Sequence, residues 1–326
     1  MGSSVNVEVG PTVGGGPLSR RSLGALGSGL VSLLLYGSLF VLPLVGLFVA
    51  PLGLIPVLQY SARHTSGVAA WGWVAALLGV TAAAGGGMAG LVFFAGYVTV
   101  IVLPALAVEW WRRAGWSDGR WAAAAGFAGL VFVLAAVVGL AWPQAPVPWT
   151  AAWLRTAGEQ ALQLYQKMGV SRGGLQLALD ASERNLTWIL PALPVTYLVT
   201  ILFWVRPRLP LLGFAWKPVP FEEYRNDDWL PVTFVLGGIG TLALAGTGRW
   251  VAVNVLATVL ILYFVQGLAI IRAHLVRYLG RGWFVRWGIA LLCLQVPLPV
   301  FVAALGIADS FFSLRPRRSD EDGRAA

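Results

Sequence analysis

The chain has 326 residues, of which 58% are hydrophobic and only 11% are charged. Soluble domains carry about 25% charged residues, so this composition excludes an ordinary soluble domain and indicates an integral membrane protein. The formal net charge is +9, but the basic residues are spread between apolar segments, which disfavours nucleic acid as a partner. We expect the arginines to set the membrane topology and to contact lipid headgroups of the bilayer.

Apolar runs long enough to cross a bilayer, about 20 residues each, recur along the chain. They cover residues 24–60, 67–84, 88–108, 121–142, 186–205, 229–247, 250–276 and 285–311. The first run is too long for one crossing and contains three prolines, which predicts either a tilted helix with a short re-entrant piece or a tight hairpin of two helices. We therefore predict an all-α, polytopic transmembrane helical bundle of about eight or nine spans.

Polar segments flank this predicted bundle and interrupt it once. Residues 1–22 are rich in Gly, Ser and Pro and predict a disordered cytoplasmic tail, residues 23–314 form the bundle, and residues 315–326 predict a disordered polar tail. Within residues 143–185, apolar and polar side chains alternate with helical spacing. This excursion predicts two amphipathic helices at the extracytoplasmic surface, which either lie on lipid or form a lid packed on the bundle.

Arginine-rich loops predict the orientation. Loops 109–120, 206–217 and 277–286 carry most of the basic residues between spans, and the positive-inside rule places them in the cytoplasm. The expected location is the bacterial cytoplasmic (inner) membrane, with a multi-pass topology and a cytoplasmic N-terminus if the first run crosses twice.

Catalytic chemistry has little support in the sequence. The acidic stretch FEEYRNDDWLP (221–231) could hold a metal ion or an acid and a base, but no histidine lies near it, and Asp228 is better interpreted as the N-cap of the following helix. His64 and His274 are the only histidines, and the one cysteine, Cys293, lies in an apolar run. No nucleotide-binding or catalytic motif appears, so we expect no metal site, no cofactor and no enzymatic activity.

Four polar side chains in the last apolar segments are the candidate ligand-binding residues. Asn254, Gln266, Gln295 and Asp309 lie where an unpaired polar group would be costly, so they indicate either a polar cavity or hydrogen bonds between neighbouring helices.

Small residues recur every four positions at the start of the first apolar run. Gly24, Ser28 and Ser32 therefore share one helical face that another backbone can approach closely. This face is expected to be either an internal packing seam or a docking surface for a partner subunit.

The C-terminal third resembles a known family. WLPVTF (229–234), NVLATVLILYFVQGLAII (254–271) and LGIADSFFSLRPR (305–317) are similar to the YybS-like bacterial membrane proteins, a domain of unknown function. That family looks distantly similar to the S components of energy-coupling-factor transporters. The resemblance implies a small-molecule binding or transport component with an ATPase partner, in which Gly24, Ser28 and Ser32 would match the docking face. The alternative is a non-enzymatic membrane scaffold or regulatory partner.

Overall fold

The computed structural model describes residues 20–63, 87–167, 172–214, 219–279, 288, 298–312 and 314. All regular elements within these ranges are helical, and no strand occurs among them. Five of the described helices are long and apolar enough to cross a membrane, and three shorter apolar helices accompany them. The expectation of a helical membrane bundle is therefore confirmed, whereas the count of eight or nine spans stays a prediction.

The first apolar run forms a hairpin. Helix α1 (Arg20–Val41) ends at Leu42, and Pro43 opens α2 (Pro43–Val49), which continues through the 3-10 turn η1 (Ala50–Gly53) into α3 (Leu54–Arg63). A Cβ at Gly46 would overlap the backbone of Leu39, so this glycine permits the tight return. Helix α1 packs against α2, η1 and α3, which is the hairpin alternative of the two expected from the sequence. The predicted run 67–84 lies outside the described residues.

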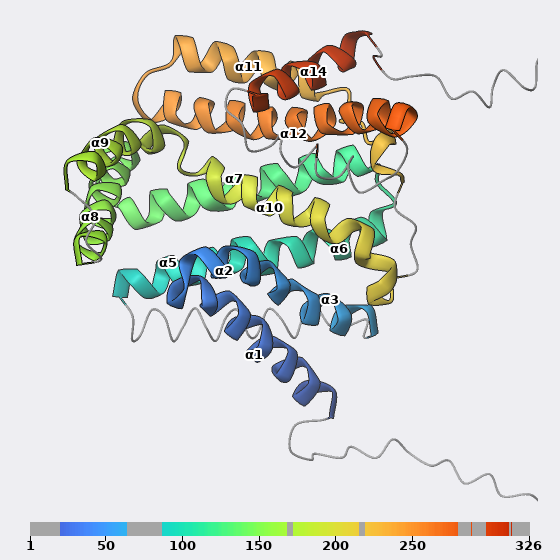
Figure 1. Cartoon of the computed structure of the whole chain (residues 1–326), viewed down its shortest axis with the longest axis horizontal. Helices are drawn as coiled ribbons and strands as arrows, with labels where there is room; N and C mark the ends of the chain where they lie inside the picture. Colours follow the sequence, from blue (N-terminus) through green and yellow to red (C-terminus); the bar gives the residue numbers. More distant parts are fainter. Residues whose placement is uncertain are drawn as a thin grey trace, which may run out of the picture.

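The axes of the central helices lie roughly along the horizontal of Figure 1. They are α5 (Gly87–Tyr97) with the π-helical turn η2 (Val98–Val102) and α6 (Leu103–Ala114), α7 (Asp118–Ala141), and α10 (Ala192–Val205) with the 3-10 turn η3 (Arg206–Leu212). Ser117 caps α7 by accepting a hydrogen bond of 3.2 Å from the Arg120 amide, and Gly115 ends α6 with a positive φ of 61°. Helices α7 and α10 pack on each other in the middle layer.

Three helices form the layer at the top of Figure 1. They are α11 (Leu230–Ala243), α12 (Gly246–Leu279) and α14 (Leu298–Phe312), and α12 packs on both of its neighbours. At 1.5 Å per residue the 34 residues of α12 extend about 51 Å, which exceeds a hydrocarbon core of about 30 Å. The predicted run 285–311 is described mainly from Leu298 onwards.

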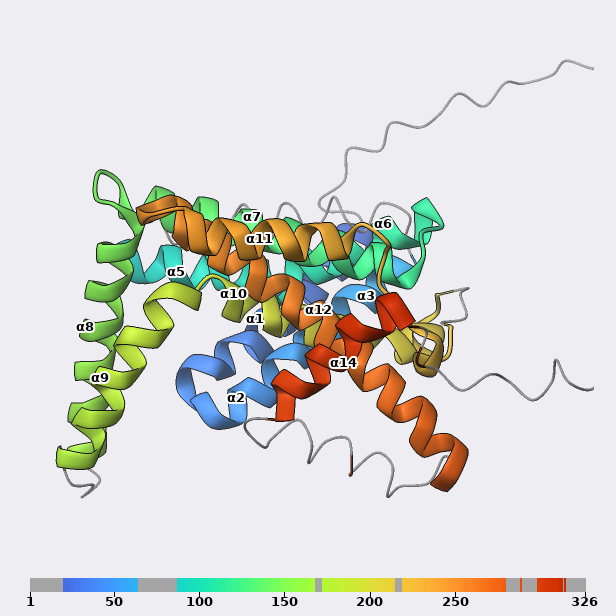
Figure 2. The same ribbon diagram turned by 90° about the horizontal axis from the view of Figure 1, so that it is seen from above.

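The excursion 143–185 forms two helices, α8 (Pro146–Lys167) and α9 (Arg172–Ile189), as predicted. They pack side by side and lie across one end of the bundle (Figures 1 and 2). A Cβ at Gly158 would overlap Leu179, so a glycine is needed where α8 meets α9. The run predicted from residue 186 starts later, because α9 continues to Ile189 and α10 begins after Pro191.

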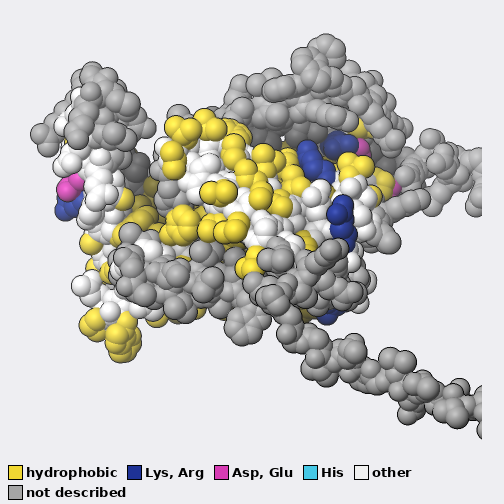
Figure 3. All heavy atoms as spheres, turned by 90° about the horizontal axis from the view of Figure 1, so that it is seen from below, with side chains coloured by type: hydrophobic (Ala, Val, Ile, Leu, Met, Phe, Trp, Pro, Cys, Tyr) yellow, Lys and Arg dark blue, Asp and Glu magenta, His cyan; other side chains and the backbone are white. Residues whose placement is uncertain are grey.

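The opposite end of the bundle carries paired charges. Arg206 on η3 forms a buried ion pair with Asp118 at the start of α7. Glu222 in the 3-10 turn η4 (Phe221–Glu223) lies 2.9 Å from Arg272 on α12. Figure 3 shows basic side chains at this end and mainly apolar ones across the middle of the face drawn. The loops before α7 and α11 therefore meet at one end, as expected of loops on the same side of a membrane.

Candidate functional site

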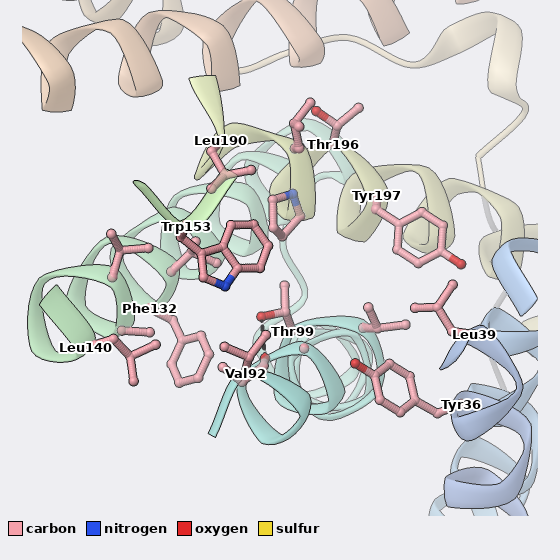
Figure 4. Close-up of a pocket in the computed structure, with 18 of the residues that line it drawn as sticks. Tyr36, Leu39, Val92, Thr99, Phe132, Leu140, Trp153, Leu190, Thr196 and Tyr197 are labelled. Atoms are coloured by element: carbon pink, nitrogen blue, oxygen red, sulfur yellow. Dashed lines mark hydrogen bonds between the residues drawn. The ribbon is translucent and has the colours of Figure 1, made fainter. Parts of the chain in front are cut away.

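A cavity of about 570 Å³ lies between α1, α2, α5, α7, α8 and α10, and it is partly open to the surroundings (Figure 4). Its size falls within the range of about 300–1,000 Å³ that is usual for small-molecule sites. The described residues that line it are aliphatic and aromatic side chains with a few threonines and tyrosines, and none is charged.

The hydroxyl groups in the cavity wall already donate hydrogen bonds to the backbone. Thr99 donates to the carbonyl of Ala95 at 2.8 Å, as threonines at helical i−4 spacing commonly do. Thr200 donates to the carbonyl of Thr196 at 2.8 Å, and Tyr197 to that of Leu47 at 2.6 Å. Because these hydroxyl groups already donate to backbone carbonyls, the wall offers a ligand mainly hydrocarbon contacts.

Tyr36 lines the cavity and belongs to an aromatic cluster behind the wall. Tyr36 packs edge-to-face on Phe93 and Tyr97, with ring centroids 5.2 Å and 5.4 Å away. A Cβ at Gly96 would overlap the Tyr36 hydroxyl, so this glycine lets the ring reach the cavity wall. The Tyr97 hydroxyl donates to Ser32 Oγ at 3.2 Å, which fixes the cluster to α1.

The π-helical turn η2 forms part of the same wall. Its residues Thr99 and Val100 line the cavity, and Pro104 follows in the first turn of α6. A proline has no N–H to donate to the carbonyl four residues earlier, so the regular ladder is interrupted next to this turn. Single π-turns occur frequently at functional sites, so this turn is a second feature that favours the cavity as the functional site.

Two tryptophans of α8 reach the cavity from the transverse layer. Trp149 and Trp153 lie one helical turn apart and both contact the cavity, together with Leu140 at the end of α7 (Figure 4). Leu190 and Leu193 bound it at the start of α10. Helix α8 thus contributes one side of the cavity, and Tyr36 lies on another side (Figure 4).

Gln266 and Asp309, predicted from the sequence as ligand-binding residues, are brought together elsewhere. Gln266 Nε2 donates to Asp309 Oδ2 at 2.9 Å, and Gln266 Oε1 accepts from the Asn226 amide at 3.1 Å. Asp309 Oδ1 accepts from the Leu314 amide at 2.9 Å. All of these groups hydrogen-bond within the protein, and neither side chain lines the large cavity.

Asn254 is separated from this pair by three turns of α12. Its Oδ1 accepts from the Ala192 amide at 3.0 Å, and its Nδ2 donates to the carbonyls of Trp188 and Trp250, both at 2.8 Å. These bonds attach α12 to the junction of α9 and α10, where Pro191 leaves backbone groups without helical partners. Gln295 lies outside the described residues, and a ligand role for these four residues stays a prediction.

The face of small residues on α1 packs against its own hairpin. A Cβ at Gly24 would lie 3.3 Å from the Tyr60 ring, and the fully buried Ser32 faces Gly53. Ser28 is half-buried and donates to the carbonyl of Ala25 at 3.0 Å. These contacts correspond to the packing seam expected as one alternative, while the docking of a partner subunit on this face stays a prediction.

The acidic stretch 221–231 is tied to arginines of other elements. Besides the Glu222–Arg272 pair, Asp227 Oδ2 lies 2.9 Å from Arg120 and accepts from the Trp229 indole at 3.0 Å. Helix α11 has Trp229 at its N-cap without a side-chain hydrogen bond, so the assignment of Asp228 as N-cap is wrong. Among the described residues, no group of three or more His, Cys, Asp or Glu side chains could hold a metal ion.

The cavity residues were missed because each is unremarkable in a sequence. Leu, Val, Ala and Phe occur throughout the apolar runs, and only the arrangement of six helices shows which of them leave a space. One signal was available: Tyr36, Thr99 and Tyr197, which line the cavity, place hydroxyl groups within otherwise apolar runs.

The fold and the cavity define an all-helical membrane protein with an apolar pocket inside its bundle. Residues 29–310 match the profile of a family described as a predicted membrane protein, DUF2232, and the chain belongs to this family. No curated protein and no solved structure matches the chain. The similarity to YybS-like proteins and to S components therefore remains a resemblance of sequence.

Proposed function

We propose that this DUF2232 protein is a multi-pass protein of the bacterial inner membrane that binds a small apolar molecule in the cavity. The observation that carries the proposal is the lining, which contains no charged side chain among the described residues and whose threonine and tyrosine donors are bonded to the backbone. A polar metabolite against this wall would lose hydrogen bonds that the lining does not replace, so such a wall favours hydrocarbon over a polar metabolite.

The test uses the full-length protein purified in mild detergent, followed by solvent extraction and mass spectrometry of retained small molecules. Ala136 on α7 lines the cavity, whereas the adjacent Ala135 is exposed on the outside. Ala136→Trp should reduce the retained apolar compound at least tenfold, and Ala135→Trp should leave it unchanged. Equal retention in the wild type and both variants contradicts the proposal.

A second pair of variants covers a failure of Ala136→Trp to fold. Val137 lines the cavity and Val138 is exposed, so Val137→Phe and Val138→Phe add the same volume at positions about 100° apart around α7, one facing the cavity and the other exposed. Elution as a single species in gel filtration and an unchanged helical circular dichroism spectrum establish that a variant is folded.

A role as the binding component of a transport system is the second part of the proposal. It rests on the sequence resemblance, and it calls for an ATPase module with a coupling membrane subunit. Affinity purification of the tagged protein followed by mass spectrometry tests it directly. Recovery of such a module supports transport, and its absence from cells in which the apolar compound is retained contradicts transport while leaving binding intact.

A non-enzymatic scaffold is the alternative function. It is favoured by the arginine–carboxylate pairs Arg206–Asp118 and Glu222–Arg272, which hold the loop between α10 and α11 in one position and so offer a fixed polar surface. Arg225 is exposed on this surface. Arg225→Glu should remove a bound partner in a pull-down if the scaffold role holds, and unchanged recovery of the partner contradicts it.

A further inference from the structure

The depth of the cavity matches one leaflet of a bilayer. Its lining runs from Phe132 to Leu140 on α7 and from Leu193 to Thr200 on α10. At 1.5 Å per residue these segments extend about 10 to 12 Å along the helices. Half of a hydrocarbon core of about 30 Å is about 15 Å, so the cavity covers most of the depth that a lipid chain occupies in one leaflet.

The two ends of the cavity differ in character. Trp149 and Trp153 of the transverse layer lie at one end, and tryptophans are enriched where a membrane meets water. Tyr36, which packs on Phe93 and Tyr97, lies on the other side of the cavity from Trp153 (Figure 4). An elongated occupant therefore has its apolar end at Tyr36 and any polar group beside α8.

The surface of the α8–α9 layer carries both signs of charge. Arg155 and Glu183 form a salt bridge of 3.6 Å, and Arg155 keeps 65% of its side chain exposed. Asp180 and Arg184 on α9 are also exposed. Arg155 lies about 200° around α8 from Trp153, so these charges are on the far side of the helix from the cavity and do not decide the class of headgroup.

From the depth of the cavity and the tryptophans at one end of it we infer that the ligand is a phospholipid, with one acyl chain in the cavity and the headgroup beside α8. This inference rests on the proposed function and names its ligand class. The chain lies against the aliphatic wall of α7 and α10 and ends at the Tyr36–Tyr97 cluster. By the positive-inside rule the leaflet is the extracytoplasmic one, because the arginine-rich loops lie at the far end.

The experiment uses two photoreactive phosphatidylethanolamines in vesicles containing the full-length protein. One carries a diazirine at the end of an acyl chain and the other carries it on the headgroup. After illumination, peptide mass spectrometry locates the adducts. The chain-end probe should label Tyr36, Thr99 or Val100, and the headgroup probe should label α8 between Trp149 and Arg155. The interchange of these two patterns overturns the orientation.

Cavity-filling variants separate the site from general lipid contact. Ala136→Trp should reduce chain-end labelling of the inner residues at least fivefold, while Ala135→Trp leaves it unchanged. Labelling confined to outward residues such as Leu34 and Val235, and equal in both variants, overturns the inference. If an extracted compound depends on the cavity but no lipid adduct forms there, binding of an apolar molecule stands and the phospholipid assignment fails. Loss of both signals contradicts both proposals.

Discussion

Gln266 on α12 donates a hydrogen bond of 2.9 Å to Asp309 on α14, at a crossing where both helices bring glycines into contact. The same glutamine accepts a hydrogen bond from Asn226 in the loop before α11. One side chain thus joins two helices and a loop. Unpaired buried polar groups cost about 1–3 kcal/mol each, so this arrangement has measurable consequences for stability.

Replacement of Gln266 by leucine should destabilise the fold. The change removes both hydrogen bonds of the amide and leaves the Asn226 N–H and one Asp309 oxygen without this partner. We expect a loss of about 2–4 kcal/mol in the free energy of unfolding, measured by denaturation in detergent. Gln163→Leu on the exposed face of α8 is the control and should have little effect. A stable Gln266→Leu protein that no longer retains the ligand would instead support the binding role predicted from the sequence.

The glycines at the α12–α14 crossing should not tolerate a methyl group. A Cβ at Gly267 would overlap the carbonyl of Val302, and one at Gly306 would overlap that of Tyr263. Overpacking costs about 1–3 kcal/mol or more, so Gly267→Ala and Gly306→Ala should each lower the thermal midpoint by several degrees. Gly238→Ala on α11 has open space around it and should be neutral or stabilising. An unchanged midpoint for Gly267→Ala would argue against this close crossing.

The buried Arg206–Asp118 pair should be far more sensitive than a surface pair. Removal of one partner leaves the other charge buried and costs about 3–5 kcal/mol, which predicts poor folding of Arg206→Met. Arg113, paired with Glu109 at 2.9 Å but 61% exposed, is the matched control, and Arg113→Met should cost less than about 1 kcal/mol. For each variant, the fraction of the protein that elutes as a single folded species in gel filtration measures the loss. Similar yields of the two variants would contradict the prediction.

Asn254→Leu should loosen the junction between α9 and α10. The substitution removes the acceptor of the Ala192 amide and the donor to the Trp188 carbonyl. Hydrogen exchange of peptides spanning residues 186–200 should therefore accelerate at least tenfold, while exchange in α14 stays as in the wild type. Asn185→Leu, on the exposed side of α9, is the control for added apolar surface. Exchange that is unchanged in this segment would contradict the anchoring role of Asn254.

Several features could be predicted from residue pattern alone because they depend on local physics. Prolines and glycines mark breaks whatever the tertiary context, so a break in the first apolar run and the two helices of the excursion could be foreseen, whereas the choice of a hairpin could not. The buried amides of Asn254 and Gln266 were recognisable as polar groups that need partners. Their partners were not recognisable, because Asn226 lies 40 residues before Gln266 and Asp309 lies 43 residues after it.

The composition by itself, with 58% hydrophobic and 11% charged residues, indicated a protein that lies in a membrane. Its apolar runs of about 20 residues indicated helices, which satisfy their own backbone groups in lipid. The sequence also predicted that arginine-rich loops would lie on one side, and the loops before α7 and α11 do meet. Tertiary structure alone decided that polar groups such as Gln266 would bond within the protein while an aliphatic space remained between α7 and α10. The position of a cavity depends on how the helices pack against one another. The same residue types occur throughout the apolar runs, so composition does not show where a cavity lies.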